Sequence, residues 1–325
     1  MKRVDAALGG AAGIVALGLA LVVVGCHRAP GDAAPAASSS AAPRTPWDAA
    51  EDACEDAVDR ADGAAAERAC NDAVKLAEGF GAKDERLAQS LHALGIHREH
   101  KGDVREAEAL YRRALAIWEA HQPDGVNAAI GATSVGAALQ LQGKHREAAA
   151  MYERAEATFE REHRDADLAK LLNNLGNLRR AEGDLARAEP VLRRALALKE
   201  KVAGADGLDT AISLGNLAVV LDESNRLPEA DAMYRRALAI KEAKLGKDHP
   251  SVALTLTNLG SLELEQKDYA AAEPLLRRAA AIQARGESSP DDARVTRTNL
   301  VKLLRATGRD AEAATLEAKA PKPAP

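Results

Sequence analysis

The sequence predicts an all-α protein in which about seven helix-turn-helix units stack as an α-solenoid. Three observations lead to this prediction. A phrase returns about every 41 residues, apolar residues in each copy follow helical spacing, and the hydrophobic 46% is rich in Ala, Leu and Val with only 2% aromatic residues. Each pair of helices would be too small to cover its own apolar stripe, so it must bury that stripe against the next pair.

The first residues are not expected to belong to the fold. Met1-Lys2-Arg3 is positively charged, residues 6–24 are almost wholly apolar or glycine, and this run stops at Gly25-Cys26. That order is typical of a secretory signal, which we predict over residues 1–25. An uncleaved transmembrane anchor is the alternative, because the run has about the ~18 residues that such a helix needs.

The ending LVVVGC at residues 21–26 resembles the lipobox of bacterial lipoproteins. The resemblance implies cleavage before Cys26, acylation of the Cys26 thiol and attachment to a bacterial envelope membrane. His27 follows the cysteine, and a residue other than Asp at that place implies the outer membrane, with the protein facing the periplasm or the cell surface.

The next segment is predicted to be a tether. Residues 26–46 contain no Leu, Ile, Val or aromatic residue and are rich in Ala, Pro and Ser. Such a segment cannot bury enough apolar surface to offset the entropy of ordering it. The tail at 318–325, AKAPKPAP, is broken by proline and is predicted to be disordered too.

The repeats fill residues 47–317 and share one frame. A small residue is expected in the middle of each first helix, a turn residue follows seven positions later, and Gly or Asn dominates the turn because a tight turn favours positive φ. The small position holds Gly95, Gly136, Gly176, Ala218, Gly260 and, as a departure, Val301. The turn position holds Gly102, Gly143, Gly183, Asn225, Lys267 and Gly308.

Each second helix carries a bulky residue with an alanine three positions later. Large and small side chains at this spacing are what interdigitated helices require. The bulky position holds Tyr111, Tyr152, Leu192, Tyr234 and Leu276. The last second helix, predicted over 310–319, lacks this residue, as is expected of a terminal unit.

These features identify a resemblance to tetratricopeptide repeat proteins. In the segment YRRALAIKEAKLGKDHPSVALTLTNLG at 234–260, the chain is similar to the subclass with a repeat of about 42 residues that includes kinesin light chains. The resemblance covers about residues 48–317. It implies a right-handed solenoid whose first helices line a concave groove, and a non-catalytic protein that binds a protein or peptide.

Two cysteines fall within the frame. Counting back 41 residues from Gly95 and from Tyr111 reaches Cys54 and Cys70, so residues 47–76 form a degenerate first unit. The two side chains should face inward and lie close together. A disulfide is favoured in an oxidising compartment, where it could contribute roughly 3 kcal/mol, and two buried thiols are the alternative.

Asparagine recurs on the predicted groove side. One position in four successive units holds Asn174, Asn216, Asn258 and Asn299, with Asn173 and Asn177 beside the first of them. Asn is a poor residue for a helix interior, so its return asks for a reason. By the family resemblance these amides bind an extended peptide. The alternative is that they pack the hairpins by bonding the neighbouring unit.

The charged residues suggest a polarised groove. Lys170, Arg180, Lys302 and Arg305 fall on the predicted groove face, whereas the first unit is acidic there, with Asp48, Glu51, Asp52, Glu55 and Asp59. A central and C-terminal basic region would prefer acidic or carboxylate-bearing segments. Solvated helix faces without a ligand are the alternative.

Other functions find little support in the sequence. The net charge of −5 offers no basic face for nucleic acid. His92, Glu99 and His100 project from one predicted helix, with His97 nearby, but they have no ligand partner at metal-binding spacing. Solvated surface histidines are therefore favoured, and no metal site or cofactor is expected. No motif supports catalysis. We therefore expect a lipid-anchored scaffold or adaptor, the alternative being an accessory subunit of an envelope complex without a groove ligand.

Overall fold

A computed structural model describes residues 44–285 and 289–318 of the chain. The described residues form fourteen α-helices and no strand, which confirms the prediction of an all-α protein built from helix pairs. The predicted signal peptide, Cys26, nearly all of the tether and most of the tail lie outside these residues.

The helices follow one another in pairs joined by short turns. In chain order they are α1 (Pro46–Asp59), α2 (Gly63–Glu78), α3 (Glu85–His100), α4 (Val104–His121), α5 (Val126–Leu141), α6 (His145–Arg161), α7 (Asp165–Ala181), α8 (Leu185–Ala203), α9 (Leu208–Glu223), α10 (Leu227–Leu245), α11 (Pro250–Glu265), α12 (Tyr269–Gln283), α13 (Pro290–Ala306) and α14 (Asp310–Ala318). The odd-numbered helices are the first helices of the pairs, and the even-numbered helices are the second.

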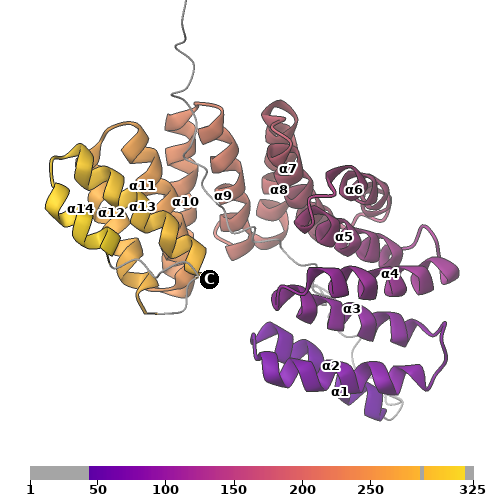
Figure 1. Ribbon diagram of the computed structural model, residues 1–325. Coiled ribbons are helices and arrows are strands. Elements are labelled where there is room, and N and C mark those ends of the chain that lie inside the picture. Colours follow the sequence, from indigo (N-terminus) through magenta and orange to yellow (C-terminus); the bar gives the residue numbers. More distant parts are fainter. Residues whose placement is uncertain (1–43, 286–288, 319–325) are drawn as a thin grey trace, which may run out of the picture. The chain divides into compact units, whose positions relative to one another are not determined.

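The chain divides into two compact units at Asn216, within α9. In the N-terminal unit, α1–α2, α3–α4, α5–α6 and α7–α8 each pack as a hairpin (Figure 1). The second helix of each of the first three hairpins also packs against the first helix of the next one. The C-terminal unit repeats this arrangement with α10 against α11 and α12 against α13. Each unit is thus a stack of helical hairpins.

The hairpins close because glycine leaves room for the bulky residue of the partner helix. A Cβ atom added to Gly176 would lie 2.5 Å from Cγ of Leu192, and one added to Gly95 would lie 2.5 Å from the ring of Tyr111. Both distances are far below a van der Waals contact. The small and bulky positions of the sequence frame therefore meet inside one hairpin.

The turns have the backbone conformation that the frame predicts. Gly102, Gly143, Gly183 and Gly308 have φ between 74° and 85°. Asn225 and Lys267 adopt φ of 58° and 61° at the same position, and Ala61 does so in the first hairpin with φ of 54°. A side chain with Cβ is strained at positive φ, so the turn geometry overrides residue preference at Lys267 and Ala61.

Candidate functional site

Within each unit, buried polar contacts connect the first helices of neighbouring hairpins. Each contact begins three residues before the small position of one first helix and reaches the following first helix. We call this set the polar seam; its pairs are Glu51–Ser90 at 2.6 Å, His92–Ser134 at 2.8 Å, Asn173–Ser213 at 2.8 Å and Thr257–Thr296 at 2.7 Å. Buried polar atoms need such partners, so the seam fixes which side chains of successive units face each other.

Asn173 belongs to the polar seam and not to an open groove. Its side chain is 1% exposed, its Nδ2 donates to Ser213 Oγ, and its Oδ1 accepts a long hydrogen bond of 3.4 Å from Asn216 Nδ2. Of the two interpretations of Asn173, ligand binding and packing of the hairpins, its geometry corresponds to packing against the neighbouring hairpin. The physical reason is its register, because a residue three positions before the small one points at the next helix.

The other recurring asparagines behave differently. Asn174 and Asn258 are 1% and 6% exposed, yet Asn174 Nδ2 and Asn258 Oδ1 have no hydrogen-bond partner among the described residues. Asn299 is half-buried and its Nδ2 also lacks a partner. Asn177 is half-buried. Two positions before the small residue, Asn174, Asn258 and Asn299 thus each carry one amide atom that makes no hydrogen bond to a described residue, whereas Asn216 at the same position bonds Asn173.

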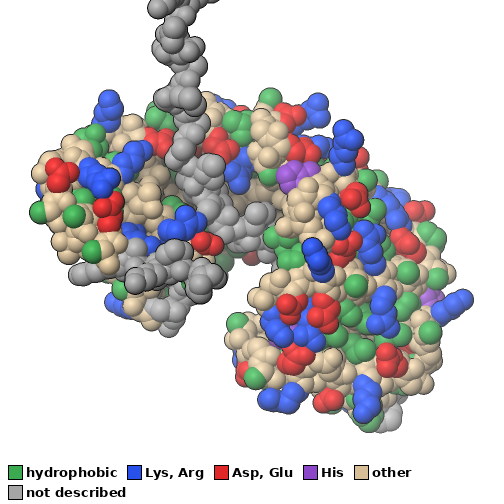
Figure 2. All heavy atoms as spheres, in the orientation of Figure 1, with side chains coloured by type: hydrophobic (Ala, Val, Ile, Leu, Met, Phe, Trp, Pro, Cys, Tyr) green, Lys and Arg blue, Asp and Glu red, His purple; other side chains and the backbone are tan. Residues whose placement is uncertain are grey.

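The basic candidates are distributed over both units. Lys170 and Arg180 are half-buried on α7 and both have interaction partners. On α13, Arg305 is ion-paired with Glu317 at 2.9 Å, whereas Lys302 is exposed and forms no ion pair with any described residue. Lys, Arg, Asp and Glu side chains are interspersed on the face of the N-terminal unit seen in Figure 2.

The acidic face predicted for the first unit needs one correction. Glu51 is 3% exposed and accepts a hydrogen bond from Ser90, so it belongs to the polar seam and not to a solvated face. Burial, followed by the nearby Glu55 and Asp52 carboxylates, raises the pKa of Glu51 to about 7 although the Ser90 hydrogen bond lowers it. Asp48 instead caps α1, and its hydrogen bond with Thr45 lowers the pKa of the Asp48 carboxyl.

The favoured interpretation of the histidines on α3 as solvated is wrong for His92 and His97. His92 is fully buried between Tyr111 and Trp118, and burial lowers its pKa to about 4, which keeps the ring neutral. His97 is 3% exposed and contacts Glu67. No group of three or more His, Cys, Asp or Glu side chains in the described ranges could hold a metal ion.

Sequence reasoning missed a second set of hydrogen bonds, one buried and one part-buried, which involve the bulky residues themselves. Tyr111 donates to Glu99 at 3.1 Å and Tyr152 donates to Gln140 at 2.9 Å, and each acceptor lies four residues after the small position. The hairpin with Leu276 has the apolar Leu264 at that place. The sequence contained a signal for these two bonds, because Glu99 and Gln140 stand at the position that can accept from the tyrosine; where the bulky residue is leucine, that position holds Leu264 in one hairpin and Arg180 in the other.

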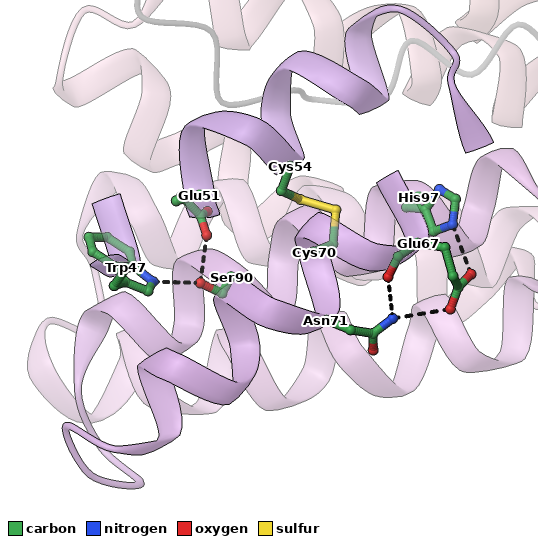
Figure 3. The surroundings of a disulfide bond; sticks show 8 residues. All are labelled: Trp47, Glu51, Cys54, Glu67, Cys70, Asn71, Ser90 and His97. Carbon is green, nitrogen blue, oxygen red and sulfur yellow. Dashed lines mark hydrogen bonds and ion pairs between the residues drawn. A yellow bond between two sulfur atoms is a disulfide. The ribbon is translucent and has the colours of Figure 1, made fainter. Parts of the chain in front are cut away.

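In the first hairpin, Cys54 and Cys70 form a disulfide with their Cα atoms 4.7 Å apart (Figure 3). Both residues are 0% exposed. The sulfur atoms occupy the space where the other hairpins place the bulky side chain against the small one. Of the two alternatives for this pair, the geometry therefore corresponds to the bonded one.

Polar contacts attach the first hairpin to α3. Trp47 Nε1 donates to Ser90 Oγ at 2.9 Å, and Glu67 on α2 accepts hydrogen bonds from Arg98 at 2.7 and 2.8 Å and from Lys101 at 3.1 Å. The Arg98 guanidinium is the largest influence that lowers the pKa of Glu67, to about 2. The carboxylate of Glu67 on α2 is thus ionised and pairs with the cationic side chains at the end of α3.

Solved structures similar to this chain share its fold. The crystal structure of BtubC (BKLC) from P. vanneervenii is 24% identical, with a TM-score of 0.55, and the match covers 74% of this chain and 92% of that one. A putative kinesin light chain from Podosopora anserina is 23% identical, with a TM-score of 0.52 and coverage of 63% and 98%. PilF from Pseudomonas aeruginosa is 18% identical, with a TM-score of 0.52 and coverage of 71% and 89%. No curated protein matches the sequence.

Family comparison gives the same result along the sequence. Models described as "Tetratricopeptide repeat" match residues 87–161 and 167–243, and a further one matches residues 252–291. Together they cover more than half of the chain. Proteins with such repeats are generally non-catalytic scaffolds for protein interaction. No helix within the described residues is both long and apolar enough to cross a membrane. The chain belongs to the tetratricopeptide repeat family.

Proposed function

We propose that this protein is a non-catalytic scaffold that binds an extended peptide segment of a partner along its first helices, held by a lipid on Cys26 at a bacterial envelope membrane. The repeat family supports the scaffold role, because stacked hairpins create extended surfaces for partners. The lipobox resemblance at residues 21–26 supports the anchor.

The unused amide groups of the recurring asparagines carry the peptide proposal. Asn174 Nδ2 and Asn258 Oδ1 form no hydrogen bond within the described part of the chain, although both residues are buried. A buried polar atom without a partner costs roughly 1–3 kcal/mol, so its presence asks for a compensating role. The main chain of an extended peptide presents N–H and C=O groups that a side-chain amide can bind once it rotates toward them.

Each unit carries this feature independently. Asn174 lies in the N-terminal unit, and Asn258 and Asn299 lie in the C-terminal unit. The proposal therefore does not require a particular placement of one unit against the other. Either unit can bind a ligand by itself.

The C-terminal unit favours an acidic ligand. Lys302 is exposed three residues after Asn299 and has no ion-pair partner in the described chain. A ligand carboxylate near this ammonium group would gain a charge-assisted hydrogen bond. Arg305 is already ion-paired with Glu317, so a ligand would have to compete for it.

A peptide array tests the binding role. Purified full-length protein, solubilised in detergent, is compared with the Asn174→Ala and Asn258→Ala variants and with the double variant. We expect the double variant to lose about tenfold or more in affinity for acidic peptides, because each lost amide bond is worth ~1 kcal/mol. Thr298→Ala changes an exposed side chain beside Asn299 and serves as the control.

The competing role gives a different result. A structural accessory subunit would retain its partners in affinity capture from native envelopes when both asparagines are changed. Unchanged capture by the double variant, with a helical circular dichroism spectrum like that of the wild type, would contradict the peptide proposal and favour the accessory subunit. Capture that depends on the asparagines would support the peptide proposal.

The anchor needs a separate measurement. Mass spectrometry of the N-terminal peptide should find cleavage before Cys26 and acyl groups on that residue. Cys26→Ser should move the protein from the membrane fraction to the soluble fraction or leave the signal uncleaved. A mature chain with an unmodified Cys26 thiol contradicts the lipid anchor and leaves the peptide proposal unaffected.

A further inference from the structure

The first hairpin has little apolar side-chain volume of its own. Its buried apolar residues are one tryptophan, two cysteines and four alanines: Trp47, Cys54, Ala57, Ala66, Cys70, Ala73 and Ala77. The second hairpin buries Leu87, Leu91, Leu94, Ile96, Leu110, Tyr111, Leu115, Ile117 and Trp118. Burial of large apolar side chains supplies most of the stabilisation of a hairpin, and alanine supplies little. Packing alone therefore holds α1–α2 much more weakly than it holds α3–α4.

The disulfide occupies the place of the missing packing contact. Cys54 and Cys70 stand at the small and bulky positions, which in α7–α8 are filled by Gly176 and Leu192 in direct contact. In the first hairpin a covalent bond joins these two positions instead (Figure 3). The cross-link thus does for α1–α2 what a bulky side chain does elsewhere.

Polar contacts with α3 add to the small apolar packing surface of this hairpin. They are the Trp47 and Glu51 contacts with Ser90 and the contacts of Glu67 with Arg98, His97 and Lys101. The Glu67 side chain is 36% exposed, and ion pairs open to solvent contribute little net stability. The carboxyl of Glu51 is buried with its Oε1 unpartnered, which opposes docking.

We propose that the Cys54–Cys70 disulfide makes the first hairpin a redox-controlled cap on the N-terminal unit. With the bond formed, α1–α2 is folded and docked on α3. With the bond reduced, the hairpin unfolds while α3 and the hairpins after it remain folded. Stacked repeats allow this separation, because each hairpin depends mainly on its immediate neighbours.

A dithiol reductant supplies the electrons and protons needed to reduce the Cys54–Cys70 disulfide. One thiolate of the dithiol attacks a sulfur of the disulfide, forms a mixed disulfide and releases the other cysteine as a thiolate. The second thiol of the reductant then displaces the protein sulfur, so the reductant becomes a cyclic disulfide. Two electrons and two protons have moved to Cys54 and Cys70. Both cysteines are 0% exposed, so the hairpin must open before a dithiol can attack.

Hydrogen exchange measured by mass spectrometry on the full chain tests the cap. The oxidised protein is compared with protein equilibrated with dithiothreitol, and loss of the Cys54–Cys70 cross-link is verified by mass. We expect amides of α1 and α2 to exchange on the order of a hundredfold faster after reduction, while amides of α5 to α8 keep their protection. The Cys54→Ser, Cys70→Ser double variant should show the same pattern without reductant.

A matched variant separates the disulfide from other effects of reductant. Cys54→Gly combined with Cys70→Leu installs the small and bulky pair that α7–α8 uses. We expect this variant to protect α1–α2 whether or not dithiothreitol is present. Three results would each overturn the cap: unchanged protection of α1–α2 in the reduced wild type, loss of protection throughout the N-terminal unit, or sensitivity of the Gly-Leu variant to reductant.

Discussion

The hairpins α1–α2 and α7–α8 share one frame but are closed in different ways. In α7–α8, Gly176 admits the side chain of Leu192, and leucines on α7 add buried apolar surface. In α1–α2 the equivalent positions are joined by the Cys54–Cys70 bond, and the hairpin buries mostly alanine.

This comparison shows what the repeat frame specifies. It requires two inward positions that meet and a turn seven residues after the small one, and Ala61 and Gly183 both adopt positive φ there. The frame does not specify which interaction joins the two inward positions. The stability of a hairpin closed by packing should depend on side-chain volume. The stability of a hairpin closed by a covalent bond should depend on the groups around that bond.

The largest expected effect comes from filling the small position of the packed hairpin. Gly176→Val places methyl groups where Leu192 already lies, because even a Cβ would approach it to 2.5 Å. We expect a loss of about 3 kcal/mol in the free energy of unfolding, measured from urea denaturation of the N-terminal unit. Gly215→Ala is the control, because nothing lies within 4 Å of an added Cβ there and alanine favours a helix. Equal destabilisation by both variants would contradict the packing account.

The second effect is a pH dependence of the stability of the first hairpin. The pKa of Glu51 is raised from its ordinary value of 4.5 to about 7, mainly by burial, so the folded state binds this proton more tightly than the unfolded state. Stability from this group is therefore greatest below pH 4.5, falls as the pH rises toward 7, and is lost above 7, by roughly 3 kcal/mol. Glu51→Gln should remove this dependence.

Urea denaturation at pH 5 and pH 8 checks the sign. The free energy of unfolding of Glu51→Gln, relative to that of the wild type, should be higher at pH 8 than at pH 5. The charged Asp52 and Glu55 remain in both proteins, so their own titration is common to the two curves. If Glu51→Gln lost more stability than the wild type between pH 5 and pH 8, Glu51 would not be the group responsible for the pH dependence.

Much of the fold could be predicted from the sequence, and less of the candidate site. The positions of Gly95, Gly176 and the turn residues follow from steric rules that act within one hairpin. The orientation of Asn173 depends on the neighbouring hairpin, whose register places Ser213 opposite it. The absence of metal-ligand partners at the right spacing favours a solvated His92, whereas the ring is buried against Tyr111 and is hydrogen-bonded to Ser134 of the next hairpin. Contacts between successive hairpins depend on the geometry of stacking, which the period of the sequence repeat does not specify.

The third effect concerns a hydrogen bond that only some of the packed hairpins contain. Tyr152→Phe removes the hydroxyl that donates to Gln140 and leaves a buried amide oxygen without a partner. We expect destabilisation of about 1–2 kcal/mol in urea denaturation. Adding Gln140→Leu should recover most of it, since the hairpin with Leu276 has Leu264 at the same place. A double variant no more stable than Tyr152→Phe alone would mean that the hydroxyl acts through other contacts.

The smallest effect concerns the turn, which the two kinds of hairpin share. Lys267 has φ of 61°, in the left-handed region that costs a side chain with Cβ about 1 kcal/mol. Lys267→Gly should therefore raise the free energy of unfolding of the C-terminal unit by up to ~1 kcal/mol. Gly102→Ala, at φ of 85°, should lower that of the N-terminal unit by a similar amount. If both variants shift stability in the same direction, backbone strain does not govern the turn, and the frame must be enforced there by contacts of the flanking helices.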